Sequence, residues 1–168
     1  ASGTCLAAFD GASKAFSLVT GGGPCRVIKL GPEVVGSGAK NYWWRNLPLH
    51  NGGSSKGAFS IAWNGELGVV VGGDYADPDI HKASGAVSVD GGDTWSVVDA
   101  GGFRSAVVWF DAKCLLAVGS DGASWSFDSG RNWKPFGKMG FHALSKASDG
   151  SVWASGSNGR VARLVPRD

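Results

Sequence analysis

The chain has 168 residues, with 28 glycines, eight tryptophans and a formal net charge of +2. That charge is too small to favour nucleic acid or an anionic membrane surface as a partner, and no apolar run is long enough to span a bilayer. Many glycines and aromatics with few runs of helix formers favour one all-β domain with tight turns.

The chain begins at Ala1, without methionine or a hydrophobic leader, so we expect a processed protein or a piece of a longer one. The three cysteines, Cys5, Cys25 and Cys114, are too few and odd in number for a disulfide framework. We expect Cys5 and Cys114 to be buried thiols, and a Cys5–Cys25 bridge stays possible. No cysteine or histidine pattern has zinc spacing.

Four repeats of short apolar strands follow one another along the chain. Asp-Gly or Asn-Gly turns such as Asp10-Gly11, Asn64-Gly65 and Asp149-Gly150 favour hairpins, because type I′ turns need positive φ. The predicted first and second strands are residues 5–9 and 15–19, 58–63 and 67–71, 103–109 and 114–118, and 141–144 and 151–154. The predicted third strands are 26–29, 86–89, 124–127 and 160–164, and fourth strands follow at 95–98 and 133–136.

These repeats predict an all-β chain of β-propeller blades. We place about four blades at residues 2–49, 56–100, 101–137 and 138–165, within one propeller segment that spans 1–168. The last blade is incomplete, because the chain stops after its third strand. A missing outer strand leaves an exposed edge, which favours part of a larger ring over a small closed one, propellers having about four to eight blades.

A motif of the form S-x-D-x-G-x-x-W occurs twice, and the second copy follows the first at about the length of one blade, roughly 40–45 residues. Its residues are Ser88, Asp90, Gly92 and Trp95, then Ser126, Asp128, Gly130 and Trp133. Ser and Asp can hydrogen-bond to turn backbone, Gly permits positive φ, and Trp can start the next strand beneath the turn. We expect both copies at outer blade corners, where they indicate fold and not activity.

This motif is the Asp box, and the chain resembles the BNR-repeat propellers. The stretches 2–6, 71–75, 103–107, 140–145 and 159–164 look like the C-terminal half of bacterial propellers similar to photosystem II assembly and stability factors. The resemblance implies a seven-bladed, extracytoplasmic propeller that serves as an assembly scaffold and binds a partner polypeptide. Relatives are also labelled oxidoreductase-like, but we find no nicotinamide, flavin or metal motif and expect no cofactor.

The loop with Asp74, Asp77, Asp79 and His81 is the candidate metal site. Carboxylate clusters can hold a hard cation, but this spacing is not that of a Ca²⁺ loop. We favour a solvated loop on one rim, with cation binding as the alternative.

Arg104 and His142 stand at comparable places near the starts of inner strands, which line the channel of a propeller. They are candidates for an axial contact with an anion or a peptide carboxylate. For Arg104 we favour the other interpretation, a structural arginine that bonds carbonyl groups between blades. The aromatic run 42–44 predicts either a stacking platform or packing between blades.

We predict a non-catalytic extracytoplasmic scaffold that binds partner polypeptides or the complementary half of the propeller. The alternative is a glycan-acting, sialidase-like hydrolase whose catalytic residues lie partly outside this chain. That chemistry needs converging arginines, a tyrosine–glutamate pair and an acid, whereas Glu33 and Glu66 are the only glutamates. No nucleophile–base pair stands out, which favours a protein without enzymatic activity. A fragment with no function of its own stays open.

Overall fold

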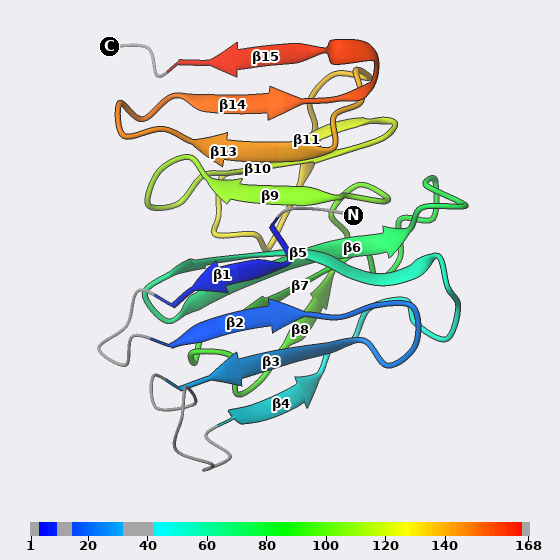
Figure 1. Ribbon diagram of the computed structural model, residues 1–168, viewed down its shortest axis with the longest axis vertical. Coiled ribbons are helices and arrows are strands. Elements are labelled where there is room, and N and C mark those ends of the chain that lie inside the picture. Colours follow the sequence, from blue (N-terminus) through cyan, green and yellow to red (C-terminus); the bar gives the residue numbers. More distant parts are fainter. Residues whose placement is uncertain (1–3, 10–14, 32–41, 166–168) are drawn as a thin grey trace.

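The computed structural model of the chain describes residues 4–9, 15–31 and 42–165. Within these ranges the strands form four antiparallel sheets, and the other regular element is one 3₁₀ turn at Ser157–Gly159 (Figure 1). The all-β, blade-like prediction is therefore confirmed. In the described residues no helix has the length and apolarity to cross a membrane. The predicted Asp10-Gly11 turn, Glu33 and the chain ends at 1–3 and 166–168 lie outside these ranges.

Each sheet follows chain order, so consecutive strands pair as a meander. The first sheet is β1 (Leu6–Ala8), β2 (Phe16–Val19), β3 (Arg26–Leu30) and β4 (Tyr42–Asn46). The second is β5 (Lys56–Asn64), β6 (Leu67–Asp74), β7 (Gly85–Ser88) and β8 (Ser96–Val98). The third is β9 (Ala106–Trp109), β10 (Leu115–Gly119), β11 (Gly122–Ser126) and β12 (Lys134–Pro135). The fourth sheet has three described strands, β13 (Ala143–Lys146), β14 (Val152–Ser155) and β15 (Val161–Leu164).

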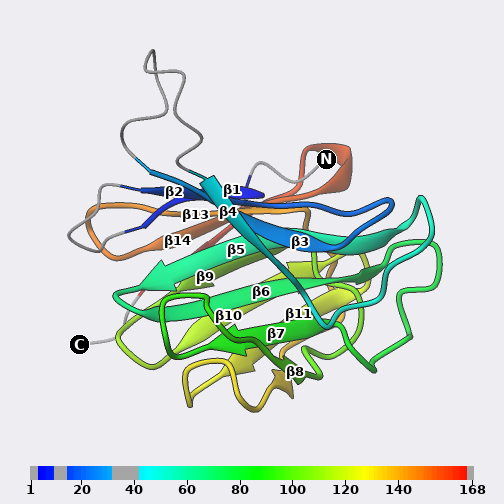
Figure 2. The same ribbon diagram turned by 90° about the horizontal axis from the view of Figure 1, so that it is seen from below.

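The inner strands β1, β5, β9 and β13 lie next to one another. Figure 1 places β4 and β15 at opposite ends of the molecule, and Figure 2 shows the second sheet running outward from β5 to β8. Three apolar cores fill the spaces between successive sheets. Alternation along each strand produces these cores, because successive side chains point to opposite faces. Ser17 and Val19, for example, face the second sheet, where Ser17 bonds Trp63, whereas Phe16 is exposed.

Two inner strands begin later than the sequence predicts, at Ala106 and Ala143. The reason is that backbone hydrogen bonds ahead of these strands run from one sheet to the preceding one. The Phe103 and Arg104 amides donate to carbonyls of Pro78 and Gly72, which belong to the preceding repeat. These residues have strand-like sequence but use their hydrogen bonds to join neighbouring blades.

The cysteines Cys5, Cys25 and Cys114 are all free thiols. Cys25 is buried, and burial raises its pKa to about 11. The prediction that Cys5 and Cys114 are buried is wrong, because Cys5 is exposed and Cys114 is partly exposed. Both stand just ahead of a strand, Cys5 before β1 and Cys114 before β10, where the sheet no longer covers them.

Candidate functional site

The inner strands line an open groove of about 610 Å³, which we call the axial groove. Its walls come from β1, β5, β9 and the connection after β9, and Lys146 of β13 also lines it. Leu6, Val108 and Trp109 give it apolar surface, while Asn64, Asp111 and Lys146 supply polar groups. The groove exists because four inner strands from four sheets lie side by side and leave a concave surface between them.

The polar end of the groove is fixed by hydrogen bonds from two neighbouring sheets. Lys146 Nζ donates to the Phe110 carbonyl at 2.8 Å, and Asn64 Nδ2 donates to the Ala112 carbonyl at 3.2 Å. Asp111 accepts the amides of Lys113 and Cys114, each at 2.8 Å. These bonds hold the pKa of Asp111 below its usual value, so this carboxylate is charged at neutral pH. The groove thus presents an anion and a cation close together.

Hydroxyl groups join the inner strands farther along. Ser60 is fully buried, its Oγ lies 2.7 Å from Thr4 Oγ1, and it accepts the Val107 amide at 3.0 Å. Ser105 Oγ donates to the His142 carbonyl at 3.0 Å. Each of these hydroxyls bonds across a boundary between sheets. Their role is therefore structural.

Arg104, a predicted axial contact, is 4% exposed and is not among the residues that line the groove. Its guanidinium donates to Ser124 Oγ at 3.1 Å, to the Phe103 carbonyl at 2.7 Å and to Asp121 at 3.1 Å. It also donates to the Gly101 carbonyl. Burial lowers the pKa of Arg104, and the charge of Asp121 opposes that shift. Its N–H donors are thus all directed at groups of the protein, and they link the loop that leaves the second sheet to the β10–β11 turn.

His142, the second axial candidate, is exposed, and its Nε2 lies 2.8 Å from Ser157 Oγ. Its side chain therefore bonds within the fourth sheet's own connection and not with Arg104. The structure does not bring the two candidates into one site.

The four metal candidates are not brought together either. Asp74 is buried and accepts hydrogen bonds from Ser55 and the Ala76 amide, which hold its pKa below the usual value. His81 instead lies 3.5 Å from Asp99. Asp77 and Asp79 are exposed in the loop. Among the described residues, no three carboxylate, histidine or cysteine side chains are placed to hold a metal ion.

The first copy of the repeated motif is a closed hydrogen-bonded corner. Ser88 Oγ donates to Asp90 at 2.8 Å and accepts the Gly92 amide at 2.8 Å. Asp90 accepts the Thr94 amide at 3.0 Å, and Trp95 Nε1 donates to the Gly92 carbonyl at 3.0 Å. Gly92 has φ +92°, a conformation that favours glycine. The side chains of Ser88, Asp90 and Trp95 are thus all hydrogen-bonded within the corner.

The second copy repeats this geometry. The corresponding hydrogen bonds measure 2.8–2.9 Å and involve Ser126, Asp128, Gly130, Asn132 and Trp133. Both tryptophans pack into cores between sheets, Trp95 between the first and second and Trp133 between the second and third. The rings therefore connect a corner to the blade that precedes it.

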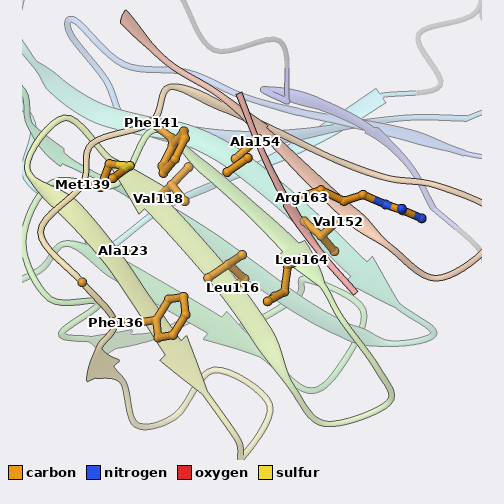
Figure 3. Close-up of a pocket in the computed structure, with 12 residues that line it drawn as sticks. Leu116, Val118, Ala123, Phe136, Met139, Phe141, Val152, Ala154, Arg163 and Leu164 are labelled. Carbon is orange, nitrogen blue, oxygen red and sulfur yellow. The ribbon is translucent and has the colours of Figure 1, made fainter. Parts of the chain in front are cut away.

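A separate apolar cavity of about 330 Å³ lies between the third and fourth sheets (Figure 3). Leu116 of β10 and Leu164 of β15 lie close together in it, and Phe136 and Met139 border it from the segment after β12. Neither this cavity nor the polar end of the axial groove was predicted. The sequence did contain a signal for the groove. Three inner strands each have a polar residue at or just after their end, namely Asn64, Asp111 and Lys146.

No protein-family model matches the chain, and none of the curated proteins does. Solved structures do match. YCF48 bound to D1 peptide aligns with a TM-score of 0.62 at 18% identity over 99% of this chain and 52% of that chain. YCF48 from Cyanidioschyzon merolae aligns with a TM-score of 0.64 at 17% identity over 97% and 53%. An ancestral GH74 enzyme aligns with a TM-score of 0.58 at 17% identity over 89% and 21%.

At these low identities the structural similarity shows the fold and nothing about activity. The four sheets are β-propeller blades, and the chain spans about half the length of the two YCF48 chains.

Proposed function

We propose that this chain is part of a propeller scaffold that binds an extended segment of a partner polypeptide and catalyses no reaction. The proposal rests mainly on the axial groove, which is open and bordered by strands from all four sheets. The similarity to a YCF48 structure with a bound peptide supports it, because the aligned region covers 99% of this chain.

The chemistry of the groove suits a peptide of mixed character. Leu6 and Val108 offer apolar contact for alternate side chains of an extended segment. Lys146 offers a cation for a carboxylate, and Asp111 offers an anion for a basic side chain. The packing of the four sheets holds these groups in place before binding, which lowers the entropic cost of association.

Selection of peptides tests the proposal. A phage library of random 12-residue peptides is selected on the chain, and fluorescence anisotropy then measures the Kd of the enriched peptides. We expect Lys146→Glu to weaken their binding by about tenfold, which corresponds to about 1.4 kcal/mol. Lys138→Glu is the matched control, since Lys138 is exposed and is not among the groove residues. No enrichment, or equal binding by both variants, would overturn the proposal.

An extracytoplasmic location belongs to the same proposal and is supported by the family resemblance alone. Fractionation of the source cells with an antibody against this chain tests it. Recovery in the cytoplasmic fraction would remove this part of the proposal without affecting peptide binding.

The GH74 neighbour raises glycan hydrolysis as the alternative, which the groove does not support. A glycosidase needs two carboxyl groups about 5–9.5 Å apart, one of them an acid with a raised pKa. Among the described residues that line the groove, Asp111 alone carries a carboxyl group, and the pKa of that group is lowered. Turnover of fluorogenic glycosides that is lost in Asp111→Asn would favour the hydrolase over the scaffold.

A further inference from the structure

The inner strand β1 turns part of its backbone toward the axial groove. The Phe9 amide donates to the Ala15 carbonyl at 2.8 Å, so these two residues form a hydrogen-bonded pair between β1 and β2. Such pairs alternate along an antiparallel ladder with pairs that exchange no bonds. Ala7 therefore belongs to the next bonded pair, whereas Leu6 and Ala8 direct their amide and carbonyl groups away from β2.

The inner strands β5 and β9 turn backbone groups to the same side. The Ile61 amide donates at 3.1 Å to the chain just ahead of β1, and the Val107 amide donates at 3.0 Å to Ser60 of β5. Both amides thus point away from their own hairpin partners, β6 and β10. Trp63 and Trp109, two residues farther along, face the same way because the ladder alternates. All six residues with this orientation line the groove: Leu6, Ala8, Ile61, Trp63, Val107 and Trp109.

Much of this backbone is left unbonded by the described chain. Neither the amides nor the carbonyls of four groove residues bond another described residue, namely Leu6, Ala8, Trp63 and Trp109. Leu6 and Ala8 are two such residues on one strand, whereas β5 and β9 supply one each and β13 contributes Lys146 alone to the lining. Both residues of β1 are exposed. A free strand edge of this kind can pair with a further extended chain.

Strand addition places particular demands on the ligand. Two of its residues, spaced two apart, must each donate an unsubstituted amide and accept through a carbonyl. These main-chain bonds supply affinity whatever the side chains are, and contacts with alternate side chains supply selectivity. Ile61 and Val108 in the groove wall offer apolar surface for such contacts.

We propose that the partner segment in the axial groove pairs its backbone with the inner edge of β1, exchanging hydrogen bonds with Leu6 and Ala8. This inference rests on the proposed function and adds how the segment is recognised. The ligand class is an extended polypeptide with two free amides at alternate residues.

An N-methyl scan of a peptide enriched by the phage selection tests the pairing. Each residue of the peptide is N-methylated in turn, which removes one amide donor, and fluorescence anisotropy gives the Kd for the whole chain. Two positions spaced two residues apart are expected to lose about tenfold in affinity, as for one hydrogen bond left unmade. The position between them is expected to change less than about twofold. Ester replacement at the two sensitive positions removes the same donor without the methyl group and is expected to give the same loss.

A proline variant tests the edge from the side of the chain. Ala8→Pro removes an amide that β2 does not use, so the sheet is retained, and peptide binding is expected to weaken about tenfold. Val161→Pro is the matched control. The Gly156 amide donates to the Arg160 carbonyl, so Val161 likewise turns its amide away from its hairpin partner, but it lies on β15 and does not line the groove.

Amide exchange in the unmodified chain gives a readout that needs no variant. Exchange at Leu6 and Ala8 is expected to slow about tenfold when the peptide binds, because their amides become bonded. Exchange at Val87 in the second sheet is expected to stay unchanged.

The results separate this mode of recognition from the proposed function. Peptides that bind, lose affinity in Lys146→Glu and yet tolerate N-methylation at every position would overturn strand addition and leave the proposed function standing. Equal binding by Ala8→Pro and Val161→Pro, or unchanged exchange at both Leu6 and Ala8, would also overturn it. Absence of any binding peptide would overturn both.

Discussion

At the scale of single residues, Arg104 shows how a buried charge can hold two blades together. Its guanidinium bonds Ser124, Asp121 and two carbonyl groups while only 4% of the residue is exposed. Removing it would leave the buried Ser124 hydroxyl and Phe103 carbonyl without this donor, which costs more than the bonds themselves contribute.

We predict that Arg104→Leu lowers the free energy of unfolding by about 3 kcal/mol. Arg104→Lys should recover little of this, because one ammonium group cannot reach acceptors that lie around a planar guanidinium. Urea denaturation of both variants measures the effect. A lysine variant as stable as the parent would show that the bond network is dispensable.

Asp90 makes stability depend on pH. Hydrogen bonds from the Thr94 side chain and amide, and from Ser88, hold its pKa below the usual value. The unfolded chain, in which this pKa is about 3.9, therefore binds more protons in acid. The stabilisation is present above pH 4 and is lost as the pH falls toward the lower folded pKa.

We predict that Asp90→Asn flattens the acid side of the stability profile and that Asp93→Asn, in an exposed position of the same corner, changes it less. Unfolding midpoints at pH 7 and pH 3 measure this. An unchanged difference between the two pH values in Asp90→Asn would contradict the assignment.

At the scale of elements, the order of strands was predictable because apolar runs alternate with turn residues. The strand limits were not. Arg104 has the sequence context of a strand, yet its amide bonds Gly72 in the preceding sheet. The sequence also could not decide whether Arg104 is an axial contact or a structural residue. Its partners Ser124 and Asp121 are distant in sequence and come close to it only in the folded chain.

The groove was missed for a related reason. Asn64, Asp111 and Lys146 come from three repeats and meet only because their strands end at the same end of the molecule. Local patterns predict which residues form strands, whereas a site assembled from several sheets requires the packing between them.

Close contact between glycines fixes how the first two sheets meet. Gly21 and Gly57 form an isolated β-bridge, and a Cβ on Gly57 would lie 2.2 Å from the Gly21 Cα. Gly57 also has φ +141°, which other residues rarely adopt.

Gly57→Ala should therefore destabilise the fold by more than about 2 kcal/mol. Gly23→Ala is the control, because nothing lies within 4 Å of its Cβ position and its φ is not in the strained range. Thermal unfolding compares them, and equal midpoints would show that the two sheets can separate locally at no cost.

At the scale of the whole molecule, the first sheet leaves an apolar face uncovered. One row across its four strands is Leu6, Leu18, Ile28 and Trp44, which pair in register. Phe16 in the adjacent row is 51% exposed. Apolar patches of this kind mark surfaces that associate.

We predict that the isolated chain binds the dye ANS and self-associates at high concentration, and that Phe16→Lys with Trp44→Lys reduces both. Sedimentation velocity and dye fluorescence measure this. Lys134→Glu on the exposed strand β12 is a control that should change neither. Dye binding unaffected by the double variant would place the apolar surface elsewhere.

The proposed binding of an extended polypeptide along the inner strands can be located residue by residue. Two-dimensional amide NMR of the isotope-labelled chain, titrated with a peptide from the phage selection, tests it most directly. Shift changes are expected at Asn64, Asp111 and Lys146, which line the polar end of the groove. Changes confined to the outer strands β8 and β12, with those three amides unmoved, would contradict it.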